Sequence, residues 1–362
     1  MGASYGQRRL WSFPGKPEGT IPPSPSSPRV AGYRSAGPVC FPPVNTALLG
    51  PLGPVSRLAL GGGGIGAVWG PTSRDEAIAT VHEAVAGGIT LFDMAPTYGQ
   101  GEAETVIGEA FGGHPPVGAM FTTKHLLGSA PPGEVYDRLS ASLDESLKRM
   151  RLDAVDAFIL HGQVGPDLPG ATRPNTPLDL FRSAVAPAFE RIREQGRIRA
   201  WGITAVGVPS AILNLLENGP RPDICQSIAN PLDALGGMRR FDEEPRPREI
   251  IAAAARNDVA VMGIRAVAAG SLTDAIDRDL PPGDPALADY ERAAPLREIA
   301  RGMGLTTANL AHRYALSMPG ISTVVLGVKN RQELSDCLAA EAAGPLPPEL
   351  VRQIDNALRG DA

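Results

Sequence analysis

Four side chains able to hold or move a proton follow three successive apolar segments of the sequence. They are Asp93, Tyr98, Lys124 and His161. The acid and the phenol follow the first segment, the lysine follows the second, and the histidine follows the third. Parallel strands that end at one edge of a sheet bring such residues together, and loops at that edge usually hold the active site. The order of residue types therefore predicts a single site at the ends of three strands.

The four residue types together suit acid–base chemistry on a carbonyl group. A tyrosine hydroxyl, with an ordinary pKa of about 10, is a weak acid near neutral pH. A lysine cation beside Tyr98 would stabilise the tyrosinate and make the proton easier to release. An aspartate would hold that lysine charged and in place, and a histidine would orient the carbonyl oxygen. This chemistry needs no metal ion, so we expect no metal site.

The rest of the chain alternates between strand and helix patterns. Strands are expected at residues 56–60, 89–92, 120–123, 157–160, 198–203, 224–228, 259–264 and 323–326. Helices are expected at residues 76–86, 102–111, 133–150, 178–194, 209–216, 248–256, 293–302, 307–317, 331–340 and 350–358. Eight strands separated by helices predict an α/β fold, a parallel (β/α)8 TIM barrel with an extra C-terminal helix. A doubly wound sheet is the alternative fold.

Composition is consistent with one large soluble domain. The chain has 362 residues, of which 43% are hydrophobic, and this suffices for the core of a barrel. The net charge of −5, with no basic block in the expected barrel, argues against nucleic acid as a partner. No apolar run reaches the roughly 18 residues of a membrane span. The three scattered cysteines fit a reducing compartment, so we expect a cytoplasmic protein.

Residues 1–50 differ from the rest of the chain. They are rich in proline, serine and glycine, and they carry five basic residues against one acidic residue. Such a segment buries too little apolar surface to offset the entropy lost on ordering, so we expect a disordered extension. A secretory signal is not expected, because no apolar segment follows the basic residues. The predicted domains are this extension and a barrel at residues 51–362.

The motif around the four residues resembles the aldo-keto reductase family. The family signature stands here as residues 93–99, DMAPTYG, followed by Glu104 and Gly108. The family's lysine is matched at the end of FTTK, residues 121–124, and its histidine at the end of DAFILH, residues 156–161. The resemblance covers residues 56–358. It implies that Tyr98 donates a proton, that Lys124 and Asp93 tune it, and that His161 orients the substrate.

The resemblance also implies a nicotinamide cofactor over the later strand ends. The expected contacts are Thr204, Gln226, Asn230, Gly270, Leu272, Gly327, Lys329, Asn330, Arg331 and Glu333. A glycine turn opens the last helix, whose N-terminus suits a phosphate. Two cations there, Lys329 and Arg331, favour NADP over NAD, although Glu333 opposes them and NAD is not excluded. The glycine run at residues 61–64 is either backbone wall for the nicotinamide or a flexible entry loop, and we expect Trp69 to line the substrate pocket.

Three functions fit this sequence. The first is an NADP-dependent oxidoreductase that reduces an aldehyde or ketone to an alcohol, with Tyr98 as proton donor. The second is a sugar or alcohol dehydrogenase that works in the oxidising direction with NAD or NADP. The third is a non-catalytic NADP-binding regulatory subunit, and the complete set of four residues argues against it. The expected partner is a small carbonyl or alcohol substrate, and the sequence does not indicate the oligomeric state.

Overall fold

The computed structural model describes residues 44–167 and 175–359. The disordered extension expected at residues 1–50 lies outside the described residues as far as residue 43. Residues 44–50 were expected to belong to that extension, but they lead into and form the first strand of the described structure, β1 (Thr46–Leu48).

Eight parallel strands close into a barrel, which confirms the predicted (β/α)8 TIM-barrel fold. Each strand pairs with its neighbours in chain order, and the last strand pairs with the first. The strands are β3 (Leu58–Gly61), β4 (Leu91–Asp93), β5 (Met120–His125), β6 (Val155–Leu160), β7 (Ile198–Thr204), β8 (Ile224–Ile228), β9 (Ala260–Ile264) and β10 (Ile321–Leu326).

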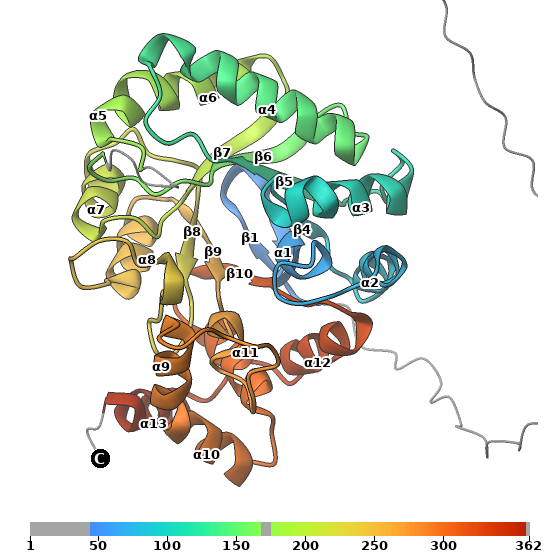
Figure 1. The fold of residues 1–362 in the computed structure, drawn as a ribbon, viewed down its shortest axis with the longest axis vertical. Coiled ribbons are helices and arrows are strands. Elements are labelled where there is room, and N and C mark those ends of the chain that lie inside the picture. The colour runs from blue at the N-terminus through green and yellow to red at the C-terminus, as the bar shows by residue number, and fades with distance from the viewer. Residues whose placement is uncertain (1–43, 168–174, 360–362) are drawn as a thin grey trace, which may run out of the picture. The chain divides into compact units, whose positions relative to one another are not determined.

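Helices lie outside the ring of strands (Figure 1). Helix α4 turns an apolar face inward, with Leu139, Leu143 and Leu147 buried at four-residue spacing. The helices are α1 (Gly62–Ile65), α2 (Arg74–Ala86), α3 (Glu102–Phe111), α4 (Val135–Met150), α5 (Leu178–Leu180), α6 (Ala186–Glu194), α7 (Pro209–Asn218), α8 (Pro247–Arg256), α9 (Pro285–Arg292), α10 (Ala294–Gly302), α11 (Thr307–Ser317), α12 (Arg331–Ala342) and α13 (Pro348–Arg359). The last of these is the expected C-terminal helix.

Two helical regions differ from the sequence expectation. The helix expected at residues 178–194 is interrupted by a π-helical turn at Phe181–Val185, between α5 and α6. Pro187 lies at the start of α6, where its missing N–H breaks the regular hydrogen-bond pattern. Helix α9 was not expected. Asp284 caps it by accepting a hydrogen bond from the backbone N–H of Ala286 at 2.8 Å.

A β-hairpin that the sequence did not predict closes one end of the barrel. Strands β1 and β2 (Pro54–Ser56) form it by antiparallel pairing. Leu49, Leu52 and Val55 of the hairpin are buried in one cluster with barrel side chains that include Ala59, Leu91, Ala157, Ala200 and Ile224. Those barrel residues lie early in their strands, so the hairpin fills the N-terminal end. The C-terminal end is left for the functional side chains.

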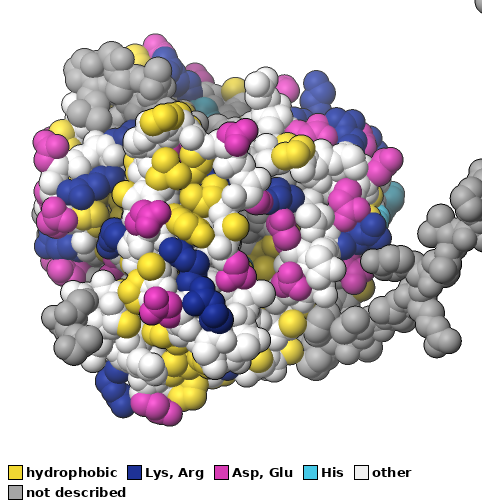
Figure 2. Space-filling view, turned by 60° about the horizontal axis from the view of Figure 1, so that its bottom comes forward, with side chains coloured by type: hydrophobic (Ala, Val, Ile, Leu, Met, Phe, Trp, Pro, Cys, Tyr) yellow, Lys and Arg dark blue, Asp and Glu magenta, His cyan; other side chains and the backbone are white. Residues whose placement is uncertain are grey.

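The described surface mixes charges of both signs. On the face in Figure 2, basic, acidic and apolar side chains are interspersed. Among the described residues, no helix has both the length and the apolar character needed to cross a bilayer.

We expect Leu49→Ala to lower the free energy of unfolding by about 2–5 kcal/mol, because it leaves a cavity where the hairpin fills the barrel. Leu48 is the matched control, since the two leucines are neighbours but Leu48 is 71% exposed and Leu49 is 0% exposed. Leu48→Ala should change the free energy of unfolding by less than about 0.5 kcal/mol. Urea unfolding of both variants measures the difference, and equal losses would show that the hairpin does not anchor the barrel.

Candidate active site

A fully buried lysine lies at the centre of the candidate site. Lys124 is on β5, and parallel pairing with β4 brings it next to Asp93 at the end of that strand. Its Nζ donates hydrogen bonds to Oδ2 of Asp93 at 2.9 Å, to the backbone oxygen of Met94 at 2.8 Å and to Oη of Tyr98 at 3.3 Å. An ammonium group has three N–H donors, so these contacts use all of them. The lysine is therefore fixed in one position.

The second carboxylate oxygen of Asp93 is also held by hydrogen bonds. Its Oδ1 accepts from Oγ1 of Thr122 at 2.5 Å and from Nε2 of Gln226 at 2.9 Å. Oγ1 of Thr204 lies 3.5 Å from Oε1 of Gln226, so Thr204 extends the network to the end of β7. Thr204 and Gln226 were expected to contact the cofactor. The structure shows both buried and joined to the network that positions Asp93.

Burial and charge act in opposite directions on the two proton-carrying groups. Burial raises the pKa of Tyr98, and although the Lys124 cation lowers it, the net pKa stays above its ordinary value. The sequence expectation considered the cation alone and missed the larger effect of burial. Burial lowers the pKa of Lys124, but Asp93 and Tyr98 together outweigh burial, and the net pKa is raised. At neutral pH the site therefore holds a protonated phenol against an ammonium cation.

His161 lies beside the phenol. The rings of Tyr98 and His161 meet edge to face, with centroids 5.5 Å apart. Nδ1 of His161 lies 3.2 Å from Oγ1 of Thr97, and its backbone N–H donates to the oxygen of His125 at 2.8 Å. The structure thus brings together all four residues that the sequence singled out, at the C-terminal ends of β4 and β5 and in the loops after β4 and β6.

A cavity of about 270 Å³ opens next to His161. Its described lining is apolar at Leu126, Val206 and Met238, and polar at Thr97, Gln163 and Arg240. The volume is close to the lower limit of about 300 Å³ for small-molecule sites, which favours a small substrate. From the sequence, the loop after His161 and residues 234–244 were expected to wall the pocket, and Gln163, Met238 and Arg240 lie in these segments, although the sequence did not single them out.

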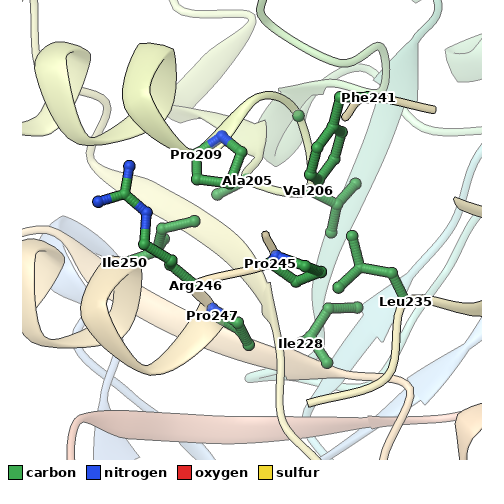
Figure 3. Close-up of a pocket in the computed structure, with 11 residues that line it drawn as sticks. Ala205, Val206, Pro209, Ile228, Leu235, Phe241, Pro245, Arg246, Pro247 and Ile250 are labelled. Atoms are coloured by element: carbon green, nitrogen blue, oxygen red, sulfur yellow. The ribbon is translucent and has the colours of Figure 1, made fainter. Parts of the chain in front are cut away.

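The segment at residues 236–247, which we call the strap, carries part of this lining. Apolar residues anchor it over a second hollow of only about 10 Å³, room for about one water molecule. The anchoring side chains meet across this hollow in Figure 3 and include Val206, Ile228, Leu235, Phe241 and Pro245. The small hollow is too tight for a substrate. The apolar contacts around the small hollow hold the strap in place, and Met238 and Arg240 of the strap border the larger cavity.

The glycine run after β3 packs tightly against the site. A Cβ added at Gly62 would lie 2.9 Å from ring carbon Cδ2 of Tyr98. A Cβ at Gly64 would lie 1.9 Å from the backbone oxygen of Val328. Backbone at these distances leaves no room for a side chain, so the run is a close-packed wall of the site rather than a flexible entry loop.

Trp69 packs against glycines of two loops. Its Nε1 would be 2.6 Å from a Cβ on Gly63 and 3.2 Å from a Cβ on Gly327. The indole therefore fits over two glycines, between the loop after β3 and the loop after β10. Trp69 was expected to line the substrate pocket, but it is not among the residues that line this cavity.

The two cations after β10 are each paired with acids. Nζ of Lys329 forms ion pairs with Asp277 and, at 3.0 Å, with Glu333. Arg331 pairs with Glu76 through Nη2 and Oε2 at 2.9 Å. The sequence expectation weighed two cations against Glu333 alone. A phosphate placed here would compete with three carboxylates.

Two side chains at the start of α12 accept hydrogen bonds from backbone N–H groups there. Oδ1 of Asn330 accepts from the N–H of Glu333 at 2.9 Å, and Oε2 of Glu333 accepts from the N–H of Lys329 at 2.9 Å. This reciprocal cap occupies two of the donors that were expected to meet a phosphate. The sequence showed the capping residue types but did not decide between a cap and a ligand site.

Two other expected cofactor contacts have structural partners. Oδ1 of Asn230 accepts from the N–H groups of Leu232 at 3.2 Å and Ala234 at 3.0 Å, and its Nδ2 donates to the oxygen of Arg265 at 3.1 Å. Leu272 is fully buried in the core. Both residues hold the loops after β8 and β9 in shape.

Arg265, directly after β9, was missed by the sequence analysis. Its guanidinium forms no hydrogen bond or ion pair with the described residues, and its Nε is buried without a partner. Burial lowers the pKa of Arg265 to about 10, although the Asp289 carboxylate opposes the shift. The same loop has left-handed backbone at Ala268, Ala269 and Gly270, and Nη1 of Arg278 would lie 3.0 Å from a Cβ on Gly270. Arg265 is half-buried, and a buried guanidinium nitrogen without a partner is costly, so this loop is suited to an anion.

Comparison with known proteins agrees with this geometry. The model of the Aldo/keto reductase family matches residues 57–359. The chain is 27% identical to L-galactose dehydrogenase of Arabidopsis thaliana over 289 residues, which is 79% of this chain and 84% of that protein.

Two solved structures share the fold. The glycerol dehydrogenase of Gluconobacter oxydans has a TM-score of 0.66 at 23% identity, covering 87% of this chain and 95% of that chain. An aldo-keto reductase of Klebsiella pneumoniae, solved in complex with NADPH, has a TM-score of 0.62 at 19% identity, covering 86% and 94%. Since the family model spans nearly all of the described barrel, the chain belongs to the aldo/keto reductase family.

Proposed function

We propose that this protein is an NADP-dependent oxidoreductase that reduces a small aldehyde or ketone to the alcohol. The observation that supports it most is the buried Lys124 ammonium, which contacts both Asp93 and Tyr98 beside a cavity bordered by His161. A lysine in a purely structural role has no need of a phenol at 3.3 Å that also faces a histidine. A perturbed acid next to a cavity is the usual sign of a catalytic centre.

The residues of this chain supply the proton chemistry. Bound NADPH provides the hydride that adds to the carbonyl carbon. Tyr98 donates its hydroxyl proton to the carbonyl oxygen, while His161 holds that oxygen in line by a hydrogen bond. Loss of the proton leaves a tyrosinate 3.3 Å from the Lys124 ammonium, which stabilises the new negative charge. Asp93 keeps the lysine charged throughout, because it is itself fixed by Thr122 and Gln226.

The residues after β9 and β10 fit a dinucleotide. The orphaned Nε of Arg265 and the nearby guanidinium of Arg278 suit a diphosphate, whose charge would pair with them. Lys329 and Arg331 supply two more cations for the additional phosphate of NADP. The related barrel solved with NADPH supports this assignment of the cofactor.

Oxidation of an alcohol is the second function that the site supports. The names of two similar proteins, L-galactose dehydrogenase and glycerol dehydrogenase, favour it. The same groups serve in reverse, with tyrosinate as the base and Lys124 lowering its affinity for the proton. A non-catalytic regulatory role is disfavoured, since a binder does not require the Tyr98–Lys124 contact.

Tyr98→Phe tests the proposed function directly. We expect kcat to fall by about 10²-fold or more, because the proton donor is lost while the packing of the ring is kept. Binding of NADPH, followed by quenching of protein fluorescence, should stay within about twofold of wild type. Turnover is read at the nicotinamide absorbance over a panel of carbonyls and alcohols. A variant with wild-type kcat would refute the role of Tyr98.

Cofactor choice depends on the carboxylates around Lys329. We expect Asp277→Asn to tighten NADPH binding by up to about tenfold, because Asp277 no longer competes with the phosphate for the lysine. Affinity for NADH, which lacks that phosphate, should stay nearly constant, and Lys329→Ala should weaken NADPH binding. Asp279→Asn, in the same loop at an exposed position, is the matched control. If Asp277→Asn and Asp279→Asn leave the NADPH-to-NADH affinity ratio equal, Lys329 does not bind the phosphate.

A further inference from the structure

We propose that the substrate carries a hydroxyl group close to its carbonyl, and that the side-chain oxygen of Gln163 accepts a hydrogen bond from it. This inference rests on the proposed function, because it concerns the substrate of the same site. It names the substrate class as small hydroxyaldehydes and sugars, or the corresponding polyols in the oxidising direction, rather than plain alkyl aldehydes.

Gln163 lines the same cavity as His161. It lies two residues after His161 in the sequence. The side chain is only 2% exposed. The backbone of Gln163 is fixed as well, since its oxygen accepts from the N–H of Thr176 at 2.8 Å. A group that reaches this amide must therefore come from the cavity or from the strap.

The contact with the strap shows which end of the Gln163 amide lacks a hydrogen-bond partner. Nε2 of Gln163 donates to the backbone oxygen of Met238 at 2.6 Å, and only the nitrogen end of an amide is able to donate. Oε1 therefore points elsewhere, and it is buried without a hydrogen-bond partner among the described residues. A buried acceptor without a partner is costly and usually has a ligand or an ordered water in the working protein.

The surroundings of the cavity favour a hydroxyl as that partner. The described lining holds no carboxylate, and its polar groups are the hydroxyl, imidazole, amide and guanidinium of Thr97, His161, Gln163 and Arg240. Oε1 is closed to solvent in the structure, so a substrate reaches it by moving a neighbouring side chain. Met238 is the suitable one, because its unbranched thioether chain adapts readily. A substrate hydroxyl supplies the donor that Oε1 lacks, and an alkyl chain does not.

The experiment compares two aldehydes of equal length, erythrose and butanal, with NADPH. In the wild type we expect kcat/KM for erythrose to exceed that for butanal by at least about tenfold, the factor that one well-made hydrogen bond provides. Gln163→Met removes the acceptor at nearly constant volume. It should lower the ratio of kcat/KM for erythrose to that for butanal by about tenfold.

Gln163→Glu separates recognition of the hydroxyl from a purely structural role. A glutamate keeps an acceptor oxygen whether or not it is protonated, so it should retain most of the preference for erythrose. Equal loss in both variants would show that Gln163 acts only by tethering the strap, and it would overturn the inference. A wild type that prefers butanal would overturn it as well.

Binding of the alcohols decides the question without turnover. Erythritol and butan-1-ol are titrated by calorimetry into the wild type and into Gln163→Met, each saturated with NADPH, the reduced cofactor, which does not react with an alcohol. A preference of about tenfold for erythritol that disappears in the methionine variant supports the inference, even if neither aldehyde is reduced and the proposed direction of reaction fails. The absence of any such preference in the wild type contradicts it.

Discussion

The ion pair between Lys124 and Asp93 is the interaction on which the rest of the site depends. Neither group is exposed to solvent by more than a few per cent, and such a pair is stable only when both partners keep their hydrogen bonds. The barrel meets this condition with contacts from three strands. Thr122 comes from β5, Gln226 from β8, and the backbone of Met94 follows β4. Removing either charge would leave the other buried and unpaired, at a cost of about 3–5 kcal/mol.

The role proposed for the Tyr98 phenol depends on this fixed pair. Burial makes Tyr98 a weaker acid than a tyrosine in water, and Lys124 offsets part of that effect. In the proposed mechanism, the hydroxyl stays protonated until a carbonyl oxygen is present to take the proton, and the Lys124 cation is already in place to stabilise the tyrosinate. Glycines also contribute, since the backbone at Gly62 approaches the Tyr98 ring too closely for any side chain.

Much of the fold was predictable because its signals are local and repeated. Strand β8 and helices α3 and α11 match the expected bounds, and the other barrel strands differ by a few residues at their ends. The hairpin was missed because its two strands are short and lie beside a proline-rich segment, and only contact with the barrel interior stabilises them. Helix α9 had a readable signal that was overlooked, an Asp-Pro pair at residues 284–285.

The site was predictable only in part, because sequence order does not reveal which polar groups already have partners. Asp93, Tyr98, Lys124 and His161 meet as their strand ends require. Gln226 and Asn230 were expected to face a cofactor, yet their amides bond to Asp93 and to the loops after β8 and β9. Arg265 was not expected at the site, yet its buried Nε has no hydrogen-bond partner among the described residues, and only the structure reveals such a group.

The most direct test of this account is the pKa of Tyr98, measured by NMR on protein with ¹³Cζ-labelled tyrosine. Comparison with Tyr98→Phe identifies its signal among those of the six tyrosines. In the wild type we expect a pKa above the ordinary value of about 10, and in Lys124→Met a still higher one, because the burial remains and the cation is gone. A wild-type pKa below about 10, or no rise in Lys124→Met, would contradict the account.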